Sequence, residues 1–155
     1  MTPPPNSVVE FISILFFLKK IRNGELLKLI QFGRLLSYPL EFRNLEDKIK
    51  DVQLSNIKVV KMAEDQILIT STANNHEVQI LVLDKVIQVN SPIVCSCTCE
   101  FFSYSLAFGL HQQKSLLNPD MFVLRPPKKK NTSLVLSGCK HIIKTARDVL
   151  SKKYV

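Results

Sequence analysis

Hydrophobic residues in the N-terminal third of the chain recur with the spacing of helices. The apolar run VVEFISILFFL (residues 8–18) follows a proline-rich tail, and Ser7 has a glutamate three positions later, the spacing of a capping box. We therefore expect a helix that begins at Ser7 and ends near Gly24, followed by a second helix over residues 25–36. Residues 42–53, FRNLEDKIKDVQ, fit either a short amphipathic helix or a loop.

The middle of the chain changes to short runs rich in Val, Ile and Thr, which are typical of strands. Polar groups such as NNH and DK interrupt these runs, as the turns of a meander would. We expect a small antiparallel sheet of three or four strands, formed by the segments NIKVVKM, DQILITSTA, EVQILVLD and VIQVNSPIV.

The last segment, CKHIIKTARDVLSKKYV, has the period of an amphipathic helix. Its polar face carries a basic row formed by Lys140, Lys144 and Arg147, and its apolar face carries Ile142, Ile143, Ala146, Val149 and Leu150. The patterns together predict an α+β protein. A tail and a helical hairpin occupy residues 1–53, and an antiparallel β-meander with a module closed by the C-terminal amphipathic helix occupies residues 54–155.

The chain of 155 residues is basic, with a formal net charge of +8 and a pI near 9.4. Such a charge favours contact with nucleic acid, with an acidic protein or with a membrane surface, and it does not choose among them. Besides the basic row of the last helix, the candidate contacts are the lysines of the loop RPPKKKNT: Lys128, Lys129 and Lys130. A solvated loop explains this lysine run equally well.

The apolar run at residues 8–18 also bears on location. It contains Glu10, it is too short to span a membrane, and neither a basic residue before it nor a small-residue site after it marks a signal peptide. We therefore expect a reducing compartment and no membrane association. There, metal ligation explains the four cysteines better than disulfides do, because two bonds within a C-x-C-x-C run would be badly constrained.

Five candidate metal ligands form two clusters, with Cys95, Cys97 and Cys99 in one and Cys139 and His141 in the other. Residues two apart in an extended segment point to the same side, so two thiolates of the first cluster can meet the second cluster at the start of the last helix. Three sulfurs and one nitrogen suit a tetrahedral, structural Zn²⁺ that has no open position for catalysis. The geometry alone leaves open which cysteine of the first cluster is unliganded.

The sequences CTCEFF and SGCKHIIKTA resemble the SWIM zinc finger, whose pattern is C-x-C, a spacer and then C-x-H. In that family an aromatic residue follows shortly after the second ligand, and Phe102 has this place if Cys97 and Cys99 are both ligands. The resemblance therefore implies that Zn²⁺ is bound by Cys97, Cys99, Cys139 and His141, with Cys95 as the spare or alternative ligand.

The spacer of about forty residues between Cys99 and Cys139 is longer than in common SWIM fingers. It is similar to a variant in virion proteins of tailed bacteriophages, and the matching parts are FFSYSLAFGLHQQK, RPPKKKN and GCKHIIKTARDVLSKKY. This resemblance covers roughly residues 76–155. It implies a structural component of a phage head, neck or tail, made in the host cytoplasm and present in several copies that contact other virion or assembly proteins.

Two histidines and four aromatic residues are further candidates for a functional site. His76 and His111 are expected to be exposed polar side chains rather than ligands. Phe101, Phe102, Tyr104 and Phe108 can form a base-stacking platform, but the helical spacing of Tyr104, Phe108 and His111 is more typical of core packing.

The sequence offers no catalytic pattern. It has no glycine-rich phosphate loop, no Ser/His/Asp order and no cluster of paired carboxylates, so we expect no enzymatic activity. The favoured hypothesis is a non-enzymatic, zinc-binding structural protein of a bacteriophage particle that mediates protein–protein assembly. The alternative is a basic zinc-finger accessory protein that binds nucleic acid.

Overall fold

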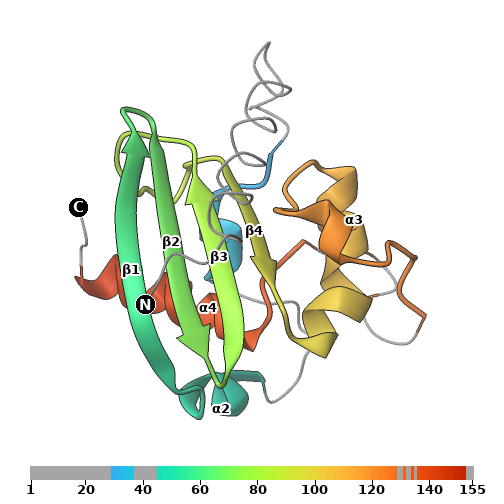
Figure 1. Ribbon diagram of the computed structural model, residues 1–155. Coiled ribbons are helices and arrows are strands. Elements are labelled where there is room, and N and C mark those ends of the chain that lie inside the picture. The colour runs from blue at the N-terminus through green and yellow to red at the C-terminus, as the bar shows by residue number, and fades with distance from the viewer. Residues whose placement is uncertain (1–28, 37–44, 129–130, 132–133, 135, 153–155) are drawn as a thin grey trace.

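The computed structural model describes residues 29–36, 45–128, 131, 134 and 136–152, which form an α+β fold (Figure 1). The elements in chain order are the 3-10 turn η2 (Phe32–Leu35), α2 (Leu45–Lys50), β1 (Leu54–Ala63), β2 (Gln66–Ala73), β3 (His76–Val82), β4 (Ile93–Cys97), the π-helical turn η3 (Phe102–Leu106), α3 (Ala107–Gln112), the 3-10 turn η4 (Pro119–Met121) and α4 (Lys140–Lys152). The sequence allowed either a helix or a loop for residues 42–53, and the structure shows that they contain a helix.

The four strands form one antiparallel sheet in the order β1-β2-β3-β4, which confirms the predicted meander. The tight turn between β2 and β3 places Asn74 and Asn75 at φ values of 49° and 68°, a left-handed conformation that asparagine tolerates better than most residues. Alternation then gives the sheet two faces. One buried row runs from Ile69 through Ile80 to Cys95, which lie opposite one another on adjacent strands.

The fourth strand begins later than the sequence predicted. Only the last two residues of VIQVNSPIV belong to β4, which continues through the cysteines to Cys97. The preceding residues form a turn in which Ser91 Oγ donates to Asp84 Oδ2 at 2.8 Å and accepts from the Gln88 N–H at 3.0 Å. Pro92 has no N–H for a strand ladder, and the apolar residues before it do not pair as a strand.

The second predicted helix, over residues 25–36, is wrong in its described part. Gln31 has φ −95° and ψ 154°, an extended conformation that forms a bridge with Pro92, and η2 follows it. The Phe32 N–H donates to Ser91 O and the Gly33 N–H donates to Val89 O, both at 2.8 Å. These long-range bonds replace the helical ones. The first predicted helix lies in residues 1–28, outside the described residues, so the hairpin remains a prediction.

One helix, α4, crosses all four strands on a single face of the sheet (Figure 1). Its apolar residues Ile142, Ala146 and Val149 are buried in a core shared with η2, α2 and the sheet. A smaller apolar cluster on the opposite face combines Leu81 and Val94 with Leu29 and Leu117. The main core therefore includes residues from both sides of position 53, where the sequence suggested a division into two regions.

Candidate metal centre

The end of β4 brings two cysteines to the edge of the main core. Cys97 is the last residue of the strand, and Cys99 lies just beyond it, directly before the helical segment. Between them, Thr98 is held against the start of β3: its N–H donates to Glu77 O at 3.2 Å, and its Oγ1 accepts from the Glu77 N–H at 3.0 Å. Thr98 is exposed, whereas both cysteines are buried, so this anchor turns their side chains inward.

The start of α4 supplies the other two candidate ligands. Cys139 precedes the helix, and its carbonyl accepts the first helical hydrogen bond, from the Ile143 N–H at 2.9 Å. A Cβ atom at Gly138 would lie 2.7 Å from Ile142 Cγ2, so the close approach of the chain to the first helical turn needs a glycine. His141 then projects from the first turn and is 4 % exposed.

The four side chains converge. The ligand atoms of Cys97, Cys99, Cys139 and His141 all lie within 4.8 Å of one another, and all four residues are buried. His141 Nδ1 is 3.8 Å from the sulfur of Cys97 and 3.8 Å from that of Cys139. A tetrahedral Zn²⁺ with ordinary bond lengths has ligand atoms about 3.6 to 3.8 Å apart. The arrangement can therefore hold a metal ion, and its three sulfurs and one nitrogen suit zinc.

The thiols of this group do not titrate alike. Hydrogen bonds from Cys139, Cys97 and His141, together with the Phe102 N–H that donates to Cys99 Sγ at 3.4 Å, lower the pKa of Cys99 far below its usual value. Burial first, and then the neighbouring sulfurs, raise the pKa of Cys139 well above its usual value. In the coupled group without a metal, one proton is therefore lost more easily than from an isolated thiol, because the neighbouring sulfurs share hydrogen bonds with the charge that remains.

Cys97 completes the set of thiols and is a proton donor within it. Its hydrogen bond with Cys139 lowers its pKa, but the hydrogen bond with Cys99 and burial outweigh this and raise the pKa of Cys97 to about 12. A metal ion would have to displace the protons of Cys97 and Cys139, because thiolates and not thiols ligate metals.

Cys95 lies outside the group of four. It is fully buried in the middle of β4, opposite Ile80, and its backbone bonds to a neighbouring segment: its N–H donates to Ser115 O, and its carbonyl accepts from the Leu117 N–H, both at 2.9 Å. Burial is the main reason that the pKa of Cys95 is raised. The structure thus brings together Cys97 and Cys99 rather than Cys95 and Cys97.

Three residues near the group were not singled out by sequence reasoning as its supports. The ring of His76, expected to be an exposed polar residue, is half-buried and lies 4.9 Å from the ring of His141. Thr145 Oγ1 donates to His141 O at 2.9 Å and shares a 2.7 Å hydrogen bond with Ser71 Oγ of β2. Thr145 lies one turn after His141 on α4, whereas His76 and Ser71 reach this place only through the packing of distant strands, so no local pattern in the sequence signals those two residues.

The predicted basic contacts are distributed differently from the expected row. Arg147 is bound within the fold, because its guanidinium donates to both carboxylate oxygens of Glu46 at 2.7 and 3.2 Å and to Leu36 O at 3.1 Å. Lys140 and Lys144 are half-buried on α4. Lys128 is exposed, and Lys129 and Lys130 lie outside the described residues.

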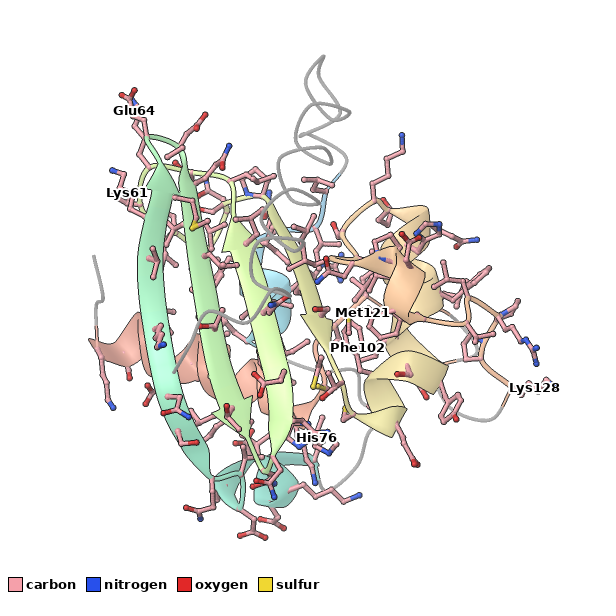
Figure 2. The ribbon with its side chains drawn as sticks, viewed as in Figure 1. Lys61, Glu64, His76, Phe102, Met121 and Lys128 are labelled. Atoms are coloured by element: carbon pink, nitrogen blue, oxygen red, sulfur yellow. The ribbon has the colours of Figure 1, made fainter. Side chains whose placement is uncertain are left out.

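The aromatic residues after Cys99 separate into two environments. Phe102, which is labelled in Figure 2, is fully buried. Its ring lies 5.5 Å from that of Phe122. Tyr104, expected to pack in the core, is instead 72 % exposed, and His111 is exposed as expected. The reason is the π-helical turn η3, which rotates the register of the side chains relative to an α-helix.

No protein family, no curated protein and no solved structure matches this chain. Within the described part of the chain, no helix is long and apolar enough to cross a membrane. The functional argument therefore starts from the four converging side chains and from the surface around them.

Proposed function

We propose that Cys97, Cys99, Cys139 and His141 bind one Zn²⁺ ion with a structural role. The supporting observation is the convergence of three thiols and one imidazole in a buried group, without a fifth donor among the described residues. Four protein ligands leave no coordination position for a substrate or an activated water, so the site would stabilise the fold rather than catalyse a reaction.

A zinc ion at this place would join parts that are far apart along the chain. It would connect the end of β4 to the first turn of α4 across the segment that contains η3, α3 and η4. Such a link adds binding free energy to folding, because the unfolded chain has no preformed site, and this helps a small core.

We further propose that the protein is a non-enzymatic component of an assembly, specifically a bacteriophage virion. The support is the resemblance of CTCEFF and SGCKHIIKTA to the long-spacer SWIM variant of virion proteins. The zinc-binding group is consistent with that resemblance, because its four members are the residues that the motif would use.

The alternative, nucleic-acid binding, has less support. Its strongest candidate surface was the basic row of α4, and Arg147 of that row already pairs with Glu46. The other two members of that row, Lys140 and Lys144, are half-buried on a helix that packs across the sheet, which makes the row a poor phosphate-binding surface.

Quantitative mass spectrometry of purified particles tests the assembly role. We expect the chain to be recovered in a fixed ratio to the major capsid protein, and to remain with particles after a high-salt wash. Recovery only in the soluble fraction, together with duplex DNA binding that weakens steeply as salt is raised, would instead support the nucleic-acid alternative.

A further inference from the structure

A groove lies beside the π-helical turn, outside the metal-binding group. Its volume is about 670 Å³, and its walls come from the start of the helical segment and from the strand-like segment before the basic loop. Figure 2 shows Lys128 of this region far from the β1 edge of the sheet, where Lys61 lies. The groove is lined by two aromatic rings, aliphatic side chains and charged groups: Glu100, Phe101, Tyr104, Val123, Arg125, Pro126 and Lys128.

The two walls are held together by contacts within the fold. Asn131, which is buried, donates its Nδ2–H to Ser105 O at 2.8 Å, and this carbonyl belongs to the π-helical turn. The rings of Phe102 and Phe122 pack behind the groove with centroids 5.5 Å apart. A π-helical turn is rare and is frequently found at functional sites, so its place in one wall is a second indication of a binding role.

Two apolar side chains of the groove face solvent. Tyr104 is 72 % exposed and Val123 is 70 % exposed, whereas Leu106, two positions after the tyrosine, is buried. Exposed tyrosine and arginine within one hollow are typical of the centre of a protein interface, where they contribute most of the binding energy. The composition therefore indicates an interaction surface rather than an incidental gap.

We propose that this groove binds an extended segment of a partner protein in which an acidic residue lies beside an apolar one. This rests on the proposed assembly function and names the chemistry of the partner. The apolar side chain would pack between Tyr104 and Val123, and the carboxylate would be bound by Arg125, whose planar guanidinium matches a carboxylate with two hydrogen bonds. Lys128 supplies a second positive charge at the same rim.

The charges and rings favour a peptide over a nucleic-acid strand. Glu100 also lines the groove, and it would repel a continuous line of phosphates but would tolerate a single carboxylate on the far side. Single-stranded nucleic acid is bound by successive exposed rings, whereas of the two rings that line this groove Tyr104 is exposed and Phe101 is half-buried. Val123 and Pro126 offer aliphatic contact, which suits an apolar side chain.

Selection from a ribosome-displayed library of short random peptides, with the zinc-loaded full chain as bait, tests the proposal. We expect the selected peptides to be enriched in Asp or Glu next to a large apolar residue. A synthetic peptide of the most enriched sequence should bind roughly tenfold or more weakly to Tyr104→Ala and to Arg125→Glu. Lys61→Glu makes the same change of charge on the exposed edge of β1 and should keep the affinity of the unmodified chain.

Three results would overturn the proposal: a selection without enrichment in acidic residues, equal binding to all variants, or tighter binding of a single-stranded oligonucleotide that Tyr104→Ala abolishes. The zinc content of each variant is measured alongside and should equal that of the unmodified chain, which shows that the fold is intact. Loss of peptide binding with the chain still present in particles would reject only the proposal that the groove binds a peptide. Absence from particles would reject only the assembly role.

Discussion

At the scale of single residues, Cys95 and Cys99 differ in environment although they lie at equal distances from Cys97 in the sequence. The sulfur of Cys95 belongs to a residue enclosed between β3 and the segment around Leu116, among apolar neighbours. Cys99 sits where the strand gives way to the helical segment, and it accepts a hydrogen bond from the Phe102 N–H. Backbone N–H groups stabilise a thiolate, so Cys99 is the better metal ligand.

This difference predicts opposite outcomes for two matched substitutions. Cys99→Ser should remove a sulfur ligand, and the purified chain should contain well below one zinc per molecule. Cys95→Ser should keep one zinc per molecule but lower the free energy of unfolding by about 1 to 3 kcal/mol, because it buries a hydroxyl among apolar groups. Elemental analysis and chemical denaturation of both variants provide the measurements, and zinc loss from Cys95→Ser alone would contradict this assignment.

Zinc binding should also release a defined number of protons. The pKa of Cys99 is lowered and the pKa values of Cys97 and Cys139 are raised, so we expect metal binding near neutral pH to release about two protons rather than three. The bound state holds fewer protons, so the affinity for zinc should rise with pH. Calorimetric titration in buffers of different ionisation enthalpy counts the protons, and release of about three would show that no thiolate is stabilised beforehand.

The four candidate metal ligands could be predicted from the sequence, but the residues that hold them in place could not. Spacing places two cysteines on one side of an extended segment and sets Cys139 and His141 at a helix start, which is local information. The contacts of His76 with His141 and of Thr98 with Glu77 depend on the register of β3 against β4. Register is set by the packing of the whole sheet, and local patterns in the sequence do not reveal that packing.

At the scale of elements, α4 is fixed at two points. Thr145 attaches its first half to β2 through Ser71, and Arg147, two residues later, attaches the middle of the helix to α2 through Glu46. The pair of Arg147 and Glu46 is bidentate and partly exposed, so its role is to hold two helices in register rather than to supply most of the stability.

Arg147→Ala should therefore lower the free energy of unfolding by about 1 kcal/mol, a value reduced by the partial exposure of the pair. Lys144→Ala on the same helix serves as the control and should change the free energy of unfolding much less. A double-mutant cycle with Glu46→Ala measures the coupling directly. A coupling energy near zero would show that the two side chains do not interact in solution.

The strands were predicted more closely than the helices near the N-terminus. The runs of Ile, Val and Thr in residues 56–84 mark three strands, and β1, β2 and β3 form there. Burial alternates cleanly in β2, whereas β1 has no fully buried residue and β3 is buried on both faces at its end. The sequence predicts the fourth strand too early because Val86, Ile87 and Val89 have the composition of a strand, although the proline and the hydrogen bonds of Ser91 hold this stretch in a turn. Residues 31–36 have a helical composition, but long-range backbone bonds to Ser91 and Val89 determine their conformation.

At the scale of the whole molecule, the metal group lies where three parts of the chain meet. β4 and α4 supply ligands, and the start of β3 packs against them through His76 and Glu77. A zinc ion here would close the fold at the end of the sheet, close to the segment that builds the peptide groove. The helical segment after Cys99 thus connects the four candidate metal ligands to the groove.

Removal of zinc should loosen this end of the molecule. We expect a strong chelator to lower the midpoint of thermal unfolding by about 10 °C or more, because the metal contributes binding free energy only to the folded chain. Readdition of zinc should restore the midpoint. The same treatment of His141→Ala should have a much smaller effect, and an unchanged midpoint in the unmodified chain would mean that the metal does not stabilise the fold.

X-ray absorption spectroscopy at the zinc edge of the purified chain tests the central claim most directly. The account predicts one zinc per molecule with three sulfur ligands at about 2.3 Å and one nitrogen ligand at about 2.0 to 2.1 Å. A spectrum without zinc, with four sulfurs, or with oxygen ligands and water in the shell would contradict it.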